Sequence, residues 1–359
     1  MNYHLVLTRR CNLNCDYCHG GEETEATEIA YSIDELEDFL SKDKDVQLML
    51  YGGEPTLKIP LIVNLMDRFP NARFMLQTNA TRLHKIPRAY VRKFHSILIS
   101  IDGREEITDR YRSSGIYKKV VKNARWLRSI GFKGDIVARM AVSQYSDIYK
   151  EVIHLLDLSG PTFDHVHWQL NVVWDADGNW RNFDGWVEKS YNPGITALVN
   201  YWIQYMREGN FLGIVPFIPI TYSLLTGESS KLRCGSGIDT FAIHVDGSIG
   251  ICPISPDWDF SIVGDIRTTH PKELRNVMHV DEPCPSCDEY GLCGGRCLFA
   301  NKQRLWGQKG FEKICEIVKH LINSIRERIP DIQEIIEEGK ISLEQFKYPE
   351  YNNGCEIIP

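Results

Sequence analysis

The distribution of cysteines constrains this chain more than any other feature of its sequence. Eleven cysteines occur in 359 residues, and none of them lies between Cys18 and Cys234. An odd number, tight grouping and an N-terminus without a secretory signal pattern argue against a disulfide framework. Thiols that are held in groups in a reducing compartment usually bind metal. The sequence therefore predicts a cytoplasmic, metal-binding protein.

Composition and charge argue against several classes of protein. Hydrophobic residues make up 43% of the chain and charged residues 25%, as in an ordinary globular protein of one large or two medium domains. No apolar run approaches the roughly 18 residues that would cross a bilayer, so we expect no membrane partner. The net charge of −7, without a basic block, argues against a nucleic-acid partner.

Short apolar strands alternate with amphipathic helices through the first 175 residues. We expect six strands, at Tyr3–Leu7, Val46–Tyr51, Phe74–Gln77, Ile97–Ile101, Ile136–Val142 and Val166–Val173. Alternation of this kind requires a parallel sheet with right-handed crossovers, and six strands are fewer than the eight of a closed barrel. The predicted fold class is α/β, with a partial (β/α)6 barrel whose functional groups follow the carboxyl ends of the strands.

The pattern changes after residue 185. Phe241–Val245 and Ser248–Ile251 flank the pair Asp246-Gly247, which predicts a β-hairpin with a primed turn. Cysteine-rich loops follow, and then a helix from about Gly310 to Ile329. We therefore divide the chain into a barrel (1–185), a connecting helical segment (186–232), a small cysteine-rich domain with the hairpin and a C-terminal helix (233–330), and a terminal helix and tail (331–359).

The first three cysteines form a compact run on the loop after the first strand. Cys11, Cys15 and Cys18 follow a CxxxCxxC spacing, which can wrap one face of a cubane iron–sulfur cluster and leave one iron without a protein ligand. A zinc site completed by a histidine is the alternative. The run resembles that of the radical S-adenosylmethionine (SAM) superfamily. That resemblance implies a [4Fe–4S] cluster whose free iron is chelated by SAM, and reductive cleavage of SAM to a 5′-deoxyadenosyl radical.

A second segment supports the same resemblance. Gly52-Gly53-Glu54-Pro55 ends the second strand, where glycines allow the backbone to approach a ligand closely. It resembles the family segment that binds the SAM amine. The resemblance also implies that SAM is contacted by Tyr17 and by residues at the ends of strands three to five, namely Gln77, Asn79, Ser100, Asp102 and Arg139. Ala80 stands where the family usually has glycine, which predicts a slightly different backbone path there.

Seven of the eight cysteines after residue 230 resemble the SPASM extension of some radical SAM enzymes, which implies two auxiliary [4Fe–4S] clusters. By position, one cluster would be ligated by Cys284, Cys287, Cys293 and Cys315, and the other by Cys234, Cys252 and Cys297. A zinc ribbon would explain only two of the cysteine pairs. The fourth site of the second group stays open: an unligated iron, a substrate thiolate and Cys355 are the alternatives, and Cys355 can equally be a free thiol.

The resemblance implies an enzyme that abstracts hydrogen from a peptide or protein and thereby crosslinks, epimerises or oxidises it. Pro253 follows Cys252, where sulfatase maturases have a catalytic aspartate, which argues against formylglycine formation. A dehydrogenase of small sugars or alcohols is an alternative, and an Fe–S electron carrier or zinc-binding module is another. Implied partners are a flavodoxin- or ferredoxin-like electron donor and, since the sequence opens on a predicted strand, a separate leader-peptide-binding protein unless no leader is needed.

Overall fold

The computed structural model describes residues 1–18, 27–158, 160, 162–172, 180–349 and 358–359. Its centre is one sheet with the strand order β10-β9-β8-β1-β2-β3-β4-β5-β6-β7. The strands from β1 to β7 are parallel neighbours. Their bounds are β1 (Asn2–Val6), β2 (Gln47–Tyr51), β3 (Arg73–Thr78), β4 (Ser96–Ser100), β5 (Asp135–Val142), β6 (His165–Leu170) and β7 (Gly213–Ile214). The predicted α/β partial barrel is confirmed.

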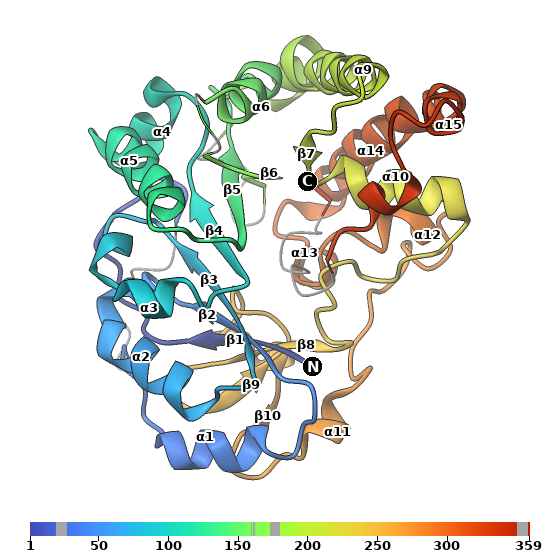
Figure 1. The fold of residues 1–359 in the computed structure, drawn as a ribbon. Helices are drawn as coiled ribbons and strands as arrows, with labels where there is room; N and C mark the ends of the chain where they lie inside the picture. Colours follow the sequence, from blue (N-terminus) through green and yellow to red (C-terminus); the bar gives the residue numbers. More distant parts are fainter. Residues whose placement is uncertain (19–26, 159, 161, 173–179, 350–357) are drawn as a thin grey trace.

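Helices cover the outer face of this curved sheet (Figure 1). They are α1 (Ile33–Leu40), α2 (Ile59–Arg68), α3 (Arg88–Val91), α4 (Glu105–Arg112), α5 (Ile116–Ser129) and α6 (Ile148–Leu156), with 3-10 turns η1 (Pro55–Lys58) and η2 (Leu83–Lys85). Ser32 and Glu35 form the capping box that begins α1, as the sequence indicates. The helices pack on the apolar outward residues of the strands, such as Leu5, Leu50 and Ile99, which are fully buried.

The inner face of the sheet is far more polar. The parallel register aligns alternate residues of neighbouring strands, so that one face carries His4, Tyr51, Gln77, Ser100 and Arg139. The apolar outer face packs against the helices. The polar inner face is left to contact a ligand. The barrel interior is therefore the place where a site is expected.

The predicted hairpin joins the same sheet. β8 (Thr240–Ile243) pairs in parallel with β1, and β9 (Ser248–Gly250) and β10 (Ile262–Asp265) continue antiparallel. Ile243 pairs with Ile249, and the four residues 244–247 connect the two strands. The prediction of a two-residue primed turn was wrong: the connection is longer, and Gly247 within it adopts a left-handed φ of 95°.

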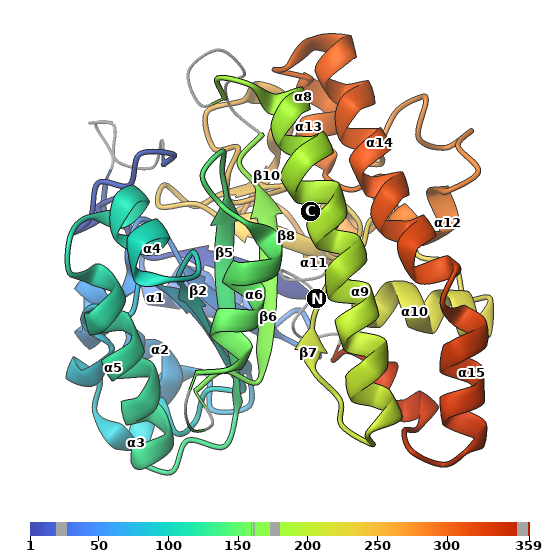
Figure 2. The same cartoon turned by 90° about the horizontal axis from the view of Figure 1, so that it is seen from above.

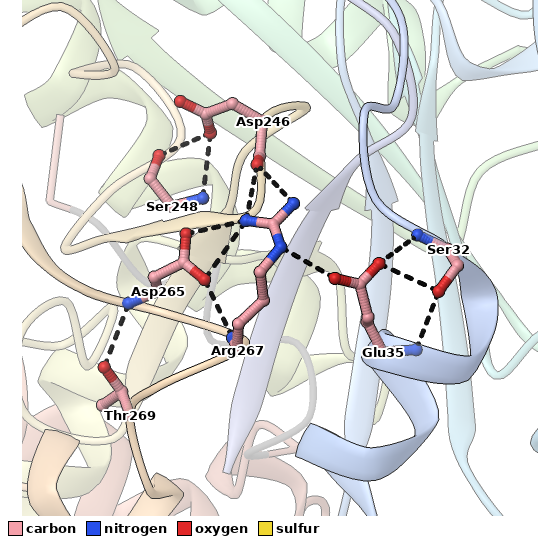
Figure 3. Close-up of polar contacts among 7 residues, drawn as sticks. All are labelled: Ser32, Glu35, Asp246, Ser248, Asp265, Arg267 and Thr269. Atoms are coloured by element: carbon pink, nitrogen blue, oxygen red, sulfur yellow. Dashed lines mark hydrogen bonds and ion pairs between the residues drawn. The ribbon is translucent and has the colours of Figure 1, made fainter.

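A salt-bridged arginine fixes this hairpin to the barrel (Figure 3). Arg267 donates from Nε to Glu35 of α1 at 2.8 Å, and from Nη1 to the Asp246 carbonyl at 3.2 Å and to Asp265 at 3.0 Å. A Cβ on Gly247 would come within 2.8 Å of the same guanidinium. The turn, the edge strand and the first helix are thus held by one side chain.

Most of the remaining helices lie across from α1 to α5, while α11 (Pro271–Leu274) lies near β10 (Figures 1 and 2). The others are α8 (Phe183–Trp186), the π-helix η3 (Val187–Tyr191), α9 (Asn192–Arg207), α10 (Phe217–Thr226), α12 (Tyr290–Cys293), α13 (Leu298–Gln303), α14 (Gly307–Arg326) and α15 (Ile329–Glu337), with 3-10 turns η4 (Asp259–Ser261) and η5 (Leu343–Phe346). The predicted C-terminal helix is α14, which packs against α9 and α10. No helix within the described ranges is both long and apolar enough to cross a membrane.

Candidate active site

A cavity of about 700 Å³ occupies the interior of the barrel and its carboxyl-terminal mouth. The cysteine loop after β1 forms one wall, with Cys11, Cys15 and Cys18. Backbone bonds fold this loop: the Cys18 amide donates to the Cys15 carbonyl at 2.9 Å. The Cys11 sulfur accepts from the Leu13 amide at 3.4 Å. Burial, and the negative charge that the neighbouring cysteines would carry, raise the pKa of Cys11 and Cys15, the latter to about 11.

The loop after β2 presses directly against this cysteine loop. The Gly53 amide donates to the Thr8 carbonyl and the Glu54 amide to the Arg10 carbonyl, both at 2.9 Å. A Cβ on Gly53 would meet the Arg10 backbone at less than van der Waals distance, so only glycine permits the contact. Gly52 and Gly53 both line the cavity.

Glu54 lies behind the cavity wall, fully buried. Its carboxylate accepts from the Thr56 amide at 2.9 Å, the Thr78 hydroxyl at 2.6 Å and the Asn79 amide at 2.7 Å. Burial raises the pKa of Glu54, while these hydrogen bonds oppose the shift. With its neighbour Pro55, which is also buried and begins η1, it joins the ends of β2 and β3 rather than facing the cavity.

Gln77, Asn79 and Ser100 line the cavity from the ends of β3 and β4. The Asn79 side chain donates to Asn12 of the cysteine loop at 3.1 Å, so it also orients that loop. Ala80, the substitute for the family glycine, has a φ of 58°. The backbone therefore keeps the left-handed conformation that glycine would favour, and the alanine bears the strain.

Asp102 is the centre of a buried polar network. It accepts from Arg112 Nε at 2.7 Å and Nη2 at 2.8 Å, from the Tyr17 hydroxyl at 2.7 Å, and from the Ala141 amide at 2.9 Å. Asp102 is fully buried, whereas Tyr17 and Arg112 line the cavity. Asp102 therefore positions the tyrosine of the cysteine loop against α4 and β5.

Arg139 lies on the inner face of β5 and lines the cavity. Its Nη1 lies 2.7 Å from His167 Nδ1. Because arginine stays protonated, this contact requires His167 to accept at Nδ1. His4 and Tyr51 line the cavity nearby, with their rings edge-to-face at 5.8 Å. Burial, aided by the Arg139 charge, lowers the pKa of His4 to about 4.

The later cysteines divide into two groups. Cys234, Cys252 and Cys297 line the same cavity as the first three; burial, and charge on Cys297, raise the pKa of Cys234 and Cys252. The other group, which interacts in the same way, is Cys284, Cys287, Cys293 and Cys315. Asn301 donates to the Cys284 sulfur at 3.4 Å. These are the groups that the SPASM resemblance implies; Cys355 lies outside the described residues.

Three groups of thiols suit iron–sulfur clusters by donor type. Within the described part of the chain, no three His, Cys, Asp or Glu side chains are close enough together to hold a single metal ion. The cavity is also lined by apolar Trp258, Leu298 and Phe299, and by Arg9 and Asp257, which form an ion pair at 2.9 Å. Two sets of three cysteines therefore line one cavity, whose remaining lining is partly polar and partly apolar.

Residues 5–158 match the sequence profile of the Radical SAM superfamily. This chain carries a radical SAM domain. It is 24% identical over 340 residues to a cysteine-type anaerobic sulfatase-maturating enzyme of Clostridium novyi (strain NT), which covers 80% of this chain and 84% of that protein. It is 21% identical over 373 residues to the radical SAM cyclopropyl synthase TigE of Paramaledivibacter caminithermalis, covering 91% and 74%.

Solved structures share the fold of this chain. Native anSMEcpe with bound AdoMet superposes with a TM-score of 0.74 at 20% identity, covering 94% of this chain and all of that one. Streptococcus suis SuiB bound to the precursor peptide SuiA gives a TM-score of 0.60 at 15% identity, covering 83% and 72%. The likeness extends beyond residue 158, so it includes the cysteine-rich part of the chain.

Several residues of the site carry no signal in the sequence. Arg112, which pairs with Asp102, ends a helix that the sequence pattern does not predict. His4 and His244 line the cavity, yet His4 lies in a short strand and His244 directly after one, where a lone histidine is ordinary. Arg9 precedes the cysteine run and Asp257 follows Cys252, but their pairing spans 248 residues. Only the three-dimensional arrangement brings these residues together.

Proposed function

We propose that this chain is a radical SAM enzyme that modifies a peptide or protein after translation. The observation that carries the proposal is the single cavity lined both by Cys11, Cys15 and Cys18 and by Cys234 and Cys252. Cys11, Cys15 and Cys18 would hold the SAM-binding [4Fe–4S] cluster. When SAM and a reduced cluster are bound there, they supply a 5′-deoxyadenosyl radical.

The residues of the barrel mouth would bind and orient SAM. Gly52 and Gly53 offer close backbone approach, Arg139 offers a cation for the SAM carboxylate, and Tyr17 offers an aromatic face. Gln77, Asn79 and Ser100 complete the polar lining. Glu54, Pro55 and Asp102 would act from behind the wall by holding these loops in place.

The later cysteines would hold two auxiliary [4Fe–4S] clusters. Cys284, Cys287, Cys293 and Cys315 would fully ligate one of them. Cys234, Cys252 and Cys297 would face the cavity with the other, close to a bound substrate. Electrons would come from a flavodoxin- or ferredoxin-like protein.

A peptide substrate is supported by a similar structure rather than by the size of the cavity. About 700 Å³ is at the size of pockets that enclose drug-sized ligands, and SAM would occupy part of it. A peptide accompanies AdoMet in one of the similar structures, anSMEcpe with Cp18Cys. Pro253 follows Cys252 here, so formylglycine formation by an aspartate at that position is not available to this chain.

Anaerobic reconstitution tests the proposal directly. We expect about twelve irons per chain, as three cubanes require, and dithionite-driven formation of 5′-deoxyadenosine. The matched controls are Cys11→Ala, which should abolish SAM cleavage, and Cys284→Ala, which should lower iron content while SAM cleavage persists. A chain that binds zinc and does not cleave SAM would refute the enzyme; turnover of a small sugar or alcohol but of no peptide would refute the substrate class.

A further inference from the structure

Of the two sets of later cysteines, the inner set that lines the cavity has one cysteine fewer than the outer set. Four cysteines (Cys284, Cys287, Cys293 and Cys315) gather in the outer group, whereas Cys234, Cys252 and Cys297 gather beside the cavity. A cubane cluster has four irons, and each takes one terminal ligand. The inner site therefore needs a further donor if all its irons are to be held by the protein.

A histidine side chain lies on the wall that carries Cys252. His244 follows β8, and its amide donates to the Ser248 carbonyl of β9 at 2.9 Å. Alternation along β9 places Ser248 and Gly250 on one face, and Cys252 follows the end of the strand. Ser248 and Cys252 line the cavity with His244. A Cβ on Gly250 would collide with His244 Nε2, so the imidazole fills the space left by a glycine that stands two residues before Cys252.

The Nε2 atom of His244 is buried and has no hydrogen-bond partner among the described residues. Only 5% of the side chain is exposed, and a buried polar atom without a partner is costly unless a ligand satisfies it. A neutral imidazole with its proton on Nδ1 would present a lone pair at Nε2.

From this juxtaposition we propose that His244 Nε2 is the fourth protein ligand of the auxiliary cluster held by Cys234, Cys252 and Cys297. Neutral imidazole nitrogen is a common metal ligand, and histidine replaces cysteine on iron in some clusters. The bond is dative, from the Nε2 lone pair to iron, so no proton or electron is transferred. This inference rests on the proposed function, because it requires the auxiliary cluster to form.

The ligand has a consequence for charge. An imidazole brings no negative charge where a thiolate brings one, and histidine ligation raises cluster potentials. The inner cluster would accordingly be easier to reduce than the outer one, which has four thiolates. With its four sites occupied, the cluster would have no open iron for a substrate thiolate.

Pulsed EPR on the reduced wild-type protein tests the assignment without a mutation. We expect a strongly coupled nitrogen on one auxiliary cluster, and the coupling should change its isotope signature in protein labelled with 15N-histidine. His244→Ala should abolish the coupling, while His84→Ala, at an exposed position, should preserve it. His244→Cys should restore a four-ligand cluster, remove the nitrogen coupling and shift the potential to a lower value.

The outcomes separate this inference from the proposed function. About twelve irons per chain and SAM cleavage without any histidine coupling would overturn the His244 assignment alone. A spectrum that changes in Cys355→Ser but not in His244→Ala would give the fourth site to the terminal cysteine instead. Absence of the EPR signals of both auxiliary clusters in the reduced wild-type protein would overturn both proposals.

Discussion

The buried network around Asp102 gives the sharpest test of how this site is held. Asp102 is fully buried and the Arg112 side chain is only 8% exposed. Removing one partner of a buried ion pair leaves an uncompensated charge, which costs about 3–5 kcal/mol. We therefore expect Asp102→Ala to lower the free energy of unfolding by about that amount, and to free Tyr17 from the 2.7 Å bond that orients it.

The assay is denaturant unfolding of the reconstituted protein under anaerobic conditions, followed by circular dichroism. Replacing both partners (Asp102→Leu with Arg112→Met) should recover most of the loss, because well-packed apolar residues often substitute for a buried pair. Asp34→Ala, which breaks an exposed ion pair with Arg68, is the matched control and should leave the midpoint unchanged. A loss from Asp102→Ala below about 1 kcal/mol, the range of surface pairs, would refute the reasoning.

Four further predictions concern the site and the hairpin beside it. Glu54→Gln would place the amide NH2 against the buried donors that the carboxylate now accepts from, which should lower the free energy of unfolding by about 1–3 kcal/mol. It should also weaken SAM binding, as measured by calorimetry. Ala80→Gly relieves a φ of 58° and should raise the thermal midpoint slightly, by up to about 1 kcal/mol in stability. Gly247→Ala, at a φ of 95° and against Arg267, should cost about 1–2 kcal/mol and lower the midpoint. His4 has a pKa of about 4 in the folded protein, below its ordinary 6.5. As the pH falls, His4 is therefore protonated in the unfolded chain before it is protonated in the folded one. Stability present above pH 6.5 should fall as the pH drops toward 4, by at most about 3 kcal/mol, and His4→Asn should flatten that dependence.

Motifs made the barrel and the thiols predictable from the sequence. The period of apolar residues predicts the strands, and the CxxxCxxC run directly after the first strand places Cys11 at the barrel mouth. The spacing of the later cysteines predicts their two groups through the resemblance. In these cases the information is local in sequence or is a repeated pattern.

The parts that could not be predicted depend on distant pairings. Nothing near Arg112 indicates Asp102, and nothing near Glu54 indicates that its carboxylate turns inward to Thr78 rather than toward the cavity. The addition of β8 beside β1 joins Thr240 to Asn2 across 238 residues. Such contacts are set by tertiary packing, which no short pattern records.

The pairing of β1 with β8 also dictates an order of events during synthesis. β1 is synthesised before its neighbour on one side, Thr240–Ile243, and the strands β2 to β7 are all synthesised between the two. Until that neighbour is made, β1 offers an unpaired parallel edge, and contacts of such long separation form slowly. The nascent barrel would thus expose this edge until the hairpin docks beside it. Truncation before residue 240 should yield an aggregating fragment rather than an independent barrel.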